Sequence, residues 1–214
     1  MASLGAVIRK ALGRYERPVS NAYRGMFLNL EDLASHIRNW TDATRILEIG
    51  CGEGAMAELL TRDYSEAEFL GIDIIGHLGR MYEGRRQNVS FRQVEAQALA
   101  HEMPGYFDLV VLNDVLHHVP DPERDDILAA AGRLLSPEGI LVFKDWVRRP
   151  TLIHAACYVA DAYVGGDRSV RYMDHAEQVE RLTRVFGPSC IRHTASIRPW
   201  TQNFAFGIKP NRPQ

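Results

Sequence analysis

The chain has 214 residues, of which 46% are hydrophobic and 24% charged, close to the averages for a soluble globular domain. This length and composition exclude a disordered chain, a collagen-like chain and a miniprotein that depends on disulfides. The net charge is −2, divided into +3 over residues 1–40 and −5 over the rest, and neither part forms a strong basic patch. Nucleic acid is therefore not expected as the main partner.

Targeting signals and disulfides are not expected either. The cysteines are odd in number, far apart and without CxxC spacing, which predicts neither a disulfide framework nor a zinc knuckle: Cys51, Cys157 and Cys190. The first 18 residues lack an apolar stretch followed by a cleavage site, and no window approaches 18 uninterrupted apolar residues. We expect a cytoplasmic protein without stable membrane insertion.

Residues 1–40 are predicted to form helices that break near Arg17-Pro18. A weak amphipathic pattern in the first helix is more typical of a cover over a core or ligand site than of a membrane surface: Leu4, Val7, Ile8 and Leu12. The second helix has apolar residues spaced mostly by three and four: Met26, Phe27, Leu28, Leu30, Leu33 and Ile37. We expect residues 1–40 to form an N-terminal helical lid.

From residue 41 onward, short apolar runs alternate with helical segments. Five strands are predicted, at 45–49, 68–75, 90–93, 107–112 and 140–143. Helices are predicted at 55–60, 122–135, 152–164 and 174–186, and a turn at 137–139. This alternation predicts a mostly parallel sheet with right-handed crossovers. Two further runs, 190–197 and 203–208, are close enough to pair as an antiparallel hairpin at its edge. Residues 41–214 then form one domain with a helical insertion at about 147–175.

The first strand ends in a glycine turn with acidic residues around it. In an open parallel sheet, ligands bind beyond the carboxyl ends of the strands. Gly50, Gly52 and Gly54 follow the pattern GxGxG, which lets the backbone turn sharply and approach a ligand. Glu48 disfavours a phosphate, and Asp73, at the end of the second strand, can accept hydrogen bonds from both ribose hydroxyls. The pattern predicts a site for a nucleoside that carries positive charge and no phosphate.

Four segments in order resemble the class I S-adenosylmethionine-dependent methyltransferases of small-molecule type. They are EIGCGEG at 48–54, Asp73, FDLVVLNDVLHHV at 107–119 and LLSPEGIL at 134–141. The resemblance implies an α/β fold, namely a seven-stranded, mostly parallel Rossmann-like sheet with helices on both faces and an antiparallel C-terminal hairpin. It also implies an enzyme with S-adenosylmethionine as its cofactor.

The resemblance assigns the methionyl half of the cofactor to the first strand and the fourth. Gly50 and Gly52 would lie under the methionyl group, with Cys51 between them as a small packing residue of the same loop. Glu48 would order the loop and the cofactor's ammonium group. Asn113, at the end of the fourth strand, would line the cofactor near its methionyl end.

The nucleoside half is assigned to the second and third strands. Asp73 would hold the ribose and Ile74 would flank the adenine. Glu95 and Ala96 fall where the family often has an aspartate and a small residue that contact the adenine edge, although glutamate is one methylene longer. Tyr23, followed by Arg24, would close over the site from the N-terminal helices.

The pair His117-His118 is the predicted catalytic feature. A neutral imidazole near pH 7 can take a proton from a hydroxyl, an amine or a carbon acid. His118 is the first choice and His117 the second, and a structural role for both stays open. If the segment were helical, Asp114 and both histidines would share one face, which is also a metal-ligand spacing, although no metal is predicted.

The substrate is expected between residues 1–40 and the insertion, because both are rich in aromatic and apolar residues. We expect methyl transfer by in-line displacement to an O, N or C atom of a small metabolite of quinone-like, aromatic, polyketide or lipid type. The alternatives are a non-methylating cyclisation or rearrangement on the same fold, methylation of RNA or protein, and a non-catalytic binding module. The protein could be a monomer or a homodimer.

Overall fold

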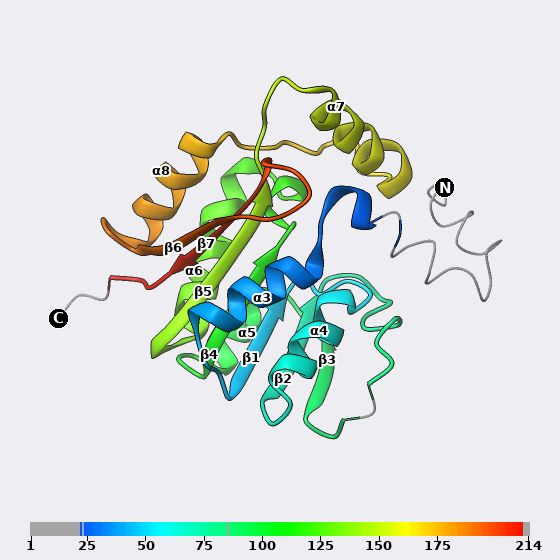
Figure 1. Cartoon of the computed structure of the whole chain (residues 1–214). Helices are drawn as coiled ribbons and strands as arrows, with labels where there is room; N and C mark the ends of the chain where they lie inside the picture. Colours follow the sequence, from blue (N-terminus) through cyan, green and yellow to red (C-terminus); the bar gives the residue numbers. More distant parts are fainter. Residues whose placement is uncertain (1–21, 23, 85, 212–214) are drawn as a thin grey trace.

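In the computed structural model, which describes residues 22, 24–84 and 86–211, seven strands form one sheet in the order β3-β2-β1-β4-β5-β7-β6 (Figure 1). The first five strands run parallel, and β7 is antiparallel to both β5 and β6. The predicted α/β sheet and its C-terminal hairpin are confirmed. The strands are β1 Arg45–Ile49, β2 Glu68–Asp73, β3 Val89–Gln93, β4 Phe107–Asn113, β5 Leu135–Trp146, β6 Ile191–Ser196 and β7 Asn203–Ile208.

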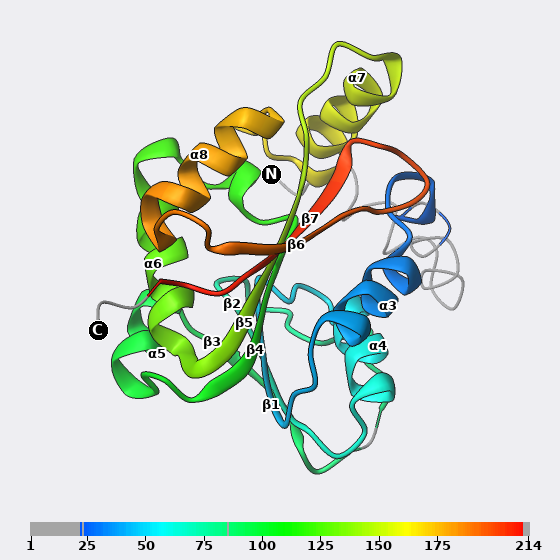
Figure 2. The same cartoon turned by 60° about the vertical axis from the view of Figure 1, so that its left-hand side comes forward.

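Helices cover both faces of the sheet (Figure 2). Helices α3 (Leu30–Trp40) and α4 (Ala55–Asp63) pack on one face. Helices α5 (Ala96–Glu102), α6 (Arg124–Leu134) and α8 (His175–Phe186) pack on the other. Helix α7 (Leu152–Val159) stands beyond the end of β5, apart from both layers (Figures 1 and 2).

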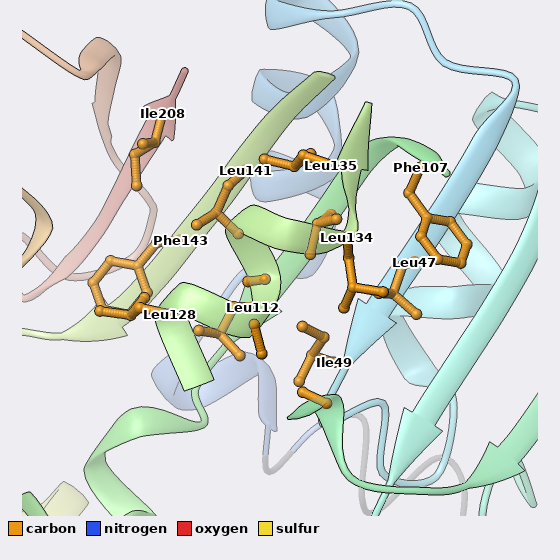
Figure 3. Packing of buried hydrophobic residues seen from close by; sticks show 14 of the residues in the cluster. Leu47, Ile49, Phe107, Leu112, Leu128, Leu134, Leu135, Leu141, Phe143 and Ile208 are labelled. Atoms are coloured by element: carbon orange, nitrogen blue, oxygen red, sulfur yellow. The ribbon is translucent and has the colours of Figure 1, made fainter. Parts of the chain in front are cut away.

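The core follows from the apolar runs of the central strands. On the α5–α6–α8 face, side chains from β1, β4 and β5 meet α6, and Leu47, Leu112, Phe143 and Leu134 show this packing in Figure 3. Each is at most 1% exposed, and burying one such side chain stabilises the fold by roughly 1.5–3 kcal/mol. This core holds the carboxyl ends of β1, β4 and β5 in a fixed relation.

Several element boundaries differ from the sequence prediction. Strand β5 begins at Leu135 and not at residue 140, and the predicted turn at 137–139 lies within it. Its pairing with β4 steps from Phe107↔Leu135 to Leu109↔Ile140, so the turn residues form an irregularity in the strand and not a separate connection. Helix α5 was not predicted, because its seven residues carry too short an apolar pattern.

The insertion and the helix after β4 also differ in detail. A 3₁₀ turn at Asp121–Glu123 precedes α6, which therefore starts at Arg124 and not at 122. The helix predicted at 152–164 is divided into α7 and a π-helical turn at Ala160–Gly165. No helix in the described ranges is both long and apolar enough to cross a membrane.

The predicted lid lies only partly within the described residues. Helix α3 begins after Asn29, whose side chain accepts a hydrogen bond from the Asp32 amide at 3.0 Å. Its buried residues pack with α4 in the core, so this part of residues 1–40 is a layer of the fold. The amphipathic pattern of residues 4–12 and the break near Arg17-Pro18 lie outside the described residues, and a lid there stays a prediction.

Candidate functional site

The glycine turn lies at the carboxyl end of β1, where the sequence predicted a ligand. The amides of Gly50 and Cys51 donate to the Ile72 carbonyl at 2.8 and 3.0 Å, which ties the turn to β2. Gly50 has φ +74°, and a Cβ there would lie 2.3 Å from Cγ2 of Val115. Gly52 has φ +49°, and a Cβ there would meet no atom within 4 Å. Gly50 is therefore needed for packing, whereas Gly52 faces open space.

Two buried oxygen atoms close to this turn have no hydrogen-bond partner among the described residues. They are Oε2 of Glu48, which is 3% exposed on β1, and Oδ1 of Asn113 at the end of β4. Burial and the negative charge of Asp73 raise the pKa of Glu48 well above its ordinary value, and the positive charge of Arg24 opposes this. Unpartnered buried acceptors are costly, so this end of the sheet fits a ligand that brings hydrogen-bond donors and positive charge.

Asp73 connects the glycine turn to the end of β2. Its Oδ2 accepts from the Gly52 amide at 2.9 Å and its Oδ1 from the Ile74 amide at 2.7 Å. Ile74 is 70% exposed, so its side chain is accessible to a ligand at this strand end. Asp73 pairs in register with the last residue of β3, so the predicted nucleoside residues Glu95 and Ala96 follow directly. Glu95 is exposed and precedes α5, and Ala96 is buried.

Cys51 and Tyr23 were also predicted to contact the cofactor. Cys51 is buried with a free thiol, and burial together with the charges of Glu48 and Asp73 raises its pKa, which suits a packing role. Tyr23 lies outside the described residues. Its neighbour Arg24 is within electrostatic reach of Glu48 and Glu53, whose charges partly offset the lowering of the Arg24 pKa by burial.

The segment after β4 is a 3₁₀ turn at Leu116–His118, which we call the histidine turn. His117 is 4% exposed, and its Nδ1 lies 2.5 Å from Oδ1 of Asp145 on β5. The backbone amide of His117 also donates to Oδ2 of Asp145 at 3.2 Å. The imidazole stacks on the ring of Tyr172, with 4.9 Å between centroids and 26° between planes. Both the position and the orientation of this ring are therefore fixed.

The charges around His117 set its proton affinity. Burial alone would lower the pKa of its imidazole, but the carboxylates of Asp145, Asp114 and Asp161 outweigh this effect and raise it. Burial would raise the pKa of Asp145, and the His117 and Lys144 charges bring it below its ordinary value. With its Nδ1 proton directed at Asp145, the ring presents Nε2 as the atom that can take a further proton.

The side chains that face Nε2 of His117 belong to the insertion after β5. Oδ2 of Asp161 lies 3.8 Å from His117 Nε2 and accepts a hydrogen bond from the Tyr172 hydroxyl. Next to Tyr172, the indole nitrogen of Trp146 donates to Nδ1 of His154 at 3.0 Å. His154 in turn meets the face of Tyr172 edge-on. This side of the site is thus mainly aromatic.

His118 and Asp114 do not share a helical face with His117, contrary to the spacing argument. The His118 side chain is 40% exposed, and its Nδ1 lies 2.8 Å from Oδ2 of Asp167. Asp114 lies before the histidine turn with φ +54°, and the buried Lys144 ammonium donates to both its oxygens at 2.7 and 2.6 Å. Asp114 therefore neutralises Lys144 at the start of the turn.

Two groups of side chains in the described structure lie close enough to hold a metal ion: Asp114, His117 and Asp145, and His117, His118 and Asp161. Each of their carboxylates already accepts a hydrogen bond from a neighbouring side chain. The geometry favours a hydrogen-bonded network over a metal centre.

Sequence reasoning missed two partners of the histidine turn, Asp145 and Asp161. Asp145 could have been found, because it is an acidic residue near the carboxyl end of a strand, as Asp73 is. Asp161 had no such signal, since it reaches the site through an insertion without a sequence motif. Tyr172 was among the aromatic residues of the insertion that were expected beside the substrate, but its stacking on His117 was not predicted.

Known proteins resemble the chain in both sequence and fold. Residues 15–189 match a family model described as a methyltransferase domain. A ubiquinone biosynthesis O-methyltransferase of Pseudomonas fluorescens is 33% identical over 136 residues, covering 58% of this chain and 56% of that protein. The chain thus spans about half the length of the curated relatives it matches.

Solved structures share the fold at low sequence identity. A mitomycin 7-O-methyltransferase has a TM-score of 0.68 at 14% identity, with 95% of this chain and 60% of that chain covered. A 1,6-didemethyltoxoflavin-N1-methyltransferase of Burkholderia thailandensis, solved with 1,6-didemethyltoxoflavin and S-adenosylhomocysteine, has a TM-score of 0.67 at 15% identity. That likeness covers 97% of this chain and 88% of that chain.

Proposed function

Because the chain belongs to the methyltransferase domain family, we propose that it transfers the methyl group of S-adenosylmethionine to a hydroxyl oxygen of a small aromatic molecule. The family and the fold that the sequence motifs suggested are confirmed, and the accepting atom and the acceptor are the new part of this proposal. It is carried by one observation, the buried His117 whose Nδ1 is held by Asp145.

The residues at the ends of β1, β2 and β4 fit the cofactor. Oε2 of Glu48 and Oδ1 of Asn113 would accept hydrogen bonds from the methionyl end, and the open space at Gly52 would receive the chain of the ligand. Asp73 would take the ribose hydroxyls, and the exposed Ile74 side chain would cover the adenine. S-adenosylmethionine supplies a methyl group on a positively charged sulfur, which becomes neutral when the methyl leaves.

His117 would act as the general base towards the acceptor. A hydroxyl holds a proton that must leave as its oxygen forms the new bond, so oxygen acceptors benefit from a base at the site. Nε2 takes that proton, and the Asp145 carboxylate stabilises the resulting imidazolium. Asp145 also fixes the tautomer in which Nε2 is free. Such a base contributes roughly 10²–10⁴-fold to the rate.

The surrounding side chains support an aromatic acceptor. Tyr172, Trp146 and His154 form an aromatic cluster beside His117 in which Tyr172 and Trp146 are buried, and Phe27 lies edge-to-face with Trp146 at 6.4 Å between centroids. Flat aromatic molecules pack favourably against such rings. In-line transfer needs the acceptor held at near-contact distance, and these rings together with Asp161 would orient it and exclude water.

The test combines product detection with a binding measurement. The protein is incubated with S-adenosylmethionine and a panel of phenols, aromatic amines and non-aromatic alcohols, and methylated products are identified by mass spectrometry. We expect methylation of phenols, with S-adenosylhomocysteine formed in equal amount. His117→Gln should lose that activity while it still binds S-adenosylhomocysteine in calorimetry. Methylation confined to the amines, or full activity of His117→Gln, would contradict the proposal.

A further inference from the structure

A buried arginine lies directly behind the histidine turn. Arg124 is the first residue of α6, yet it is only 1% exposed and is among the largest fully buried side chains. Arginine is rarely buried unless paired, and a positive charge in the first turn of a helix opposes the helix dipole. The other charged residues of that first turn, Asp125 and Asp126, have the expected sign. Such a placement breaks two local rules, which points to a constraint from the neighbouring site.

The Arg124 guanidinium joins two segments that are far apart in the sequence. Its Nε donates to the carbonyl of Val119 at 2.9 Å, and its Nη2 donates to the carbonyl of Arg171 at 2.7 Å. Val119 directly follows the histidine turn, and Arg171 precedes Tyr172. The Arg171 amide in turn donates to the His117 carbonyl at 2.9 Å. These contacts link Arg124 to the two backbone segments that carry the stacked His117 and Tyr172 side chains.

The chemistry of this connection suits arginine specifically. A guanidinium holds its donors in a rigid planar fork, so it can bond two carbonyls in fixed relative positions, whereas a lysine ammonium is a point charge on a flexible stem. The Nη1 atom lies 3.6 Å from Asp121 and has no hydrogen-bond partner among the described residues. The Asp145 carboxylate, which holds His117, also interacts favourably with the Arg124 charge.

We propose that Arg124 is a positioning residue that holds the histidine turn against the Tyr172 segment and so keeps His117 aligned with Asp145. The effect on turnover rests on the proposed function, but the alignment itself is a property of the folded chain. Arg124 does not touch the reacting atoms and acts through the backbone on either side of them. Misplacement of a reacting group by about 1 Å can cost roughly 10²-fold in rate, which sets the scale expected for its loss.

The test compares Arg124→Met and Arg124→Lys with Arg181→Met. Arg181 is a suitable control because it is also mostly buried between α6 and α8 and is paired with Asp125 at 2.6 Å and Asp121 at 2.8 Å. In the described structure its hydrogen bonds and ion pairs go to Asp121 and Asp125 and not to the histidine turn. The proton between His117 Nδ1 and Asp145 should give a downfield signal in one-dimensional proton NMR, assigned by its loss in His117→Gln.

We expect Arg124→Met to lose or broaden that signal and to lower kcat by about 10²-fold, with the Kd for S-adenosylhomocysteine within threefold of the wild type. Arg181→Met should keep both the signal and kcat. Arg124→Lys should recover part of each, since it restores the charge but not the fork, and it serves as the test variant if Arg124→Met does not fold.

Two results would overturn the proposal. One is an unchanged downfield signal in the folded Arg124 variants, and the other is a loss of kcat that Arg181→Met shows equally. If no acceptor is methylated by the wild type, the proposed function fails, and the NMR comparison still decides whether Arg124 positions His117.

Discussion

Replacing Asp145 by asparagine separates the role of the carboxylate from that of the imidazole. The substitution keeps the shape of the side chain and removes the negative charge 2.5 Å from His117 Nδ1. It also places an amide group where the two Asp145 oxygens now accept from the His117 ring and from the His117 backbone amide. We expect the variant to fold, because the apolar packing of β5 is unchanged, and calorimetry with S-adenosylhomocysteine checks this.

The size of the effect follows from the lost charge. A hydrogen bond to a charged group contributes roughly 1.5–3 kcal/mol, and the Asp145 carboxylate makes such a bond to the imidazolium that forms during proton transfer. At 1.36 kcal/mol per tenfold change in rate, kcat should fall by about 10- to 100-fold. His117→Gln removes the base itself and should cost more, roughly 10²–10⁴-fold.

The pH dependence of kcat gives an independent test, because the direction of its shift in Asp145→Asn can be predicted. In the wild type the carboxylates raise the pKa of His117, so the free-base form and the activity rise with pH through a value above that of an ordinary histidine. Without the Asp145 charge, the pKa of His117 falls below its wild-type value, because burial disfavours the imidazolium and only the Asp114 and Asp161 carboxylates still oppose this. The lower limb of the pH–kcat profile should therefore move to lower pH in Asp145→Asn.

The matched control is Asp167→Asn, since Asp167 holds Nδ1 of His118 at 2.8 Å as Asp145 holds that of His117. Steady-state kinetics and calorimetry with S-adenosylhomocysteine are measured for both variants. Asp167→Asn should change kcat less than threefold. The reasoning would be refuted if Asp145→Asn stayed within threefold of the wild type, or if Asp167→Asn showed the larger loss, which would transfer the base to His118.

Three further expectations concern the cofactor end and the core. Gly50→Ala should lower the free energy of unfolding by about 2–5 kcal/mol in urea titrations, because the new Cβ overpacks against Val115 on a left-handed backbone. Gly52→Ala should lower it by only about 1–2 kcal/mol but should weaken the binding of S-adenosylhomocysteine at least tenfold. Glu48→Gln should lower the affinity for S-adenosylhomocysteine by about 10- to 100-fold. Because folding raises the pKa of Glu48, the wild type loses stability as the pH rises above the pKa of this group in the unfolded chain. The Tm of ligand-free Glu48→Gln relative to that of the wild type should therefore increase from pH 5 to pH 8. A constant difference in Tm would contradict this. Phe143→Ala, at a site 1% exposed, should cost about 3–5 kcal/mol, against less than about 0.5 kcal/mol for Leu152→Ala at 92% exposed; similar losses would contradict the assigned core.

The shape of the glycine turn could be predicted from the sequence because its determinants are local, whereas its role in binding the cofactor stays a prediction. Gly50 directly follows β1 and Asp73 ends β2, and parallel strands bring their carboxyl ends to one edge of the sheet. The residues on the acceptor side could not be predicted in the same way, because their contacts join segments that are far apart in the sequence. His117 was visible as a residue, but its direction depends on Asp145 and Tyr172, which lie 28 and 55 positions further along the chain.

Local patterning also misjudged the secondary structure where tertiary contacts decide. The histidine turn is too short for a helix, and Asp114 leaves helical geometry to pair with Lys144, a long-range contact that no periodicity records. The turn predicted at 137–139 was wrong, because pairing with β4 keeps these residues within β5 as an irregularity of the strand. His118, preferred from the sequence, is the more exposed histidine, and the catalytic assignment of either one stays open to the experiments above.

The order of the strands has a practical consequence for engineering. The groups proposed to bind the methyl donor come from β1, β2 and the tip of β4, whereas the ring surfaces beside His117 come from the end of β5 and the insertion after it. Mutant libraries confined to residues 152–173 should therefore change which molecules are accepted without altering donor affinity. Asn113 ends β4 and Asp114 follows it, at the place where the two sets of groups meet. Substitutions at these two positions would affect both sets at once, so they are the positions to leave fixed.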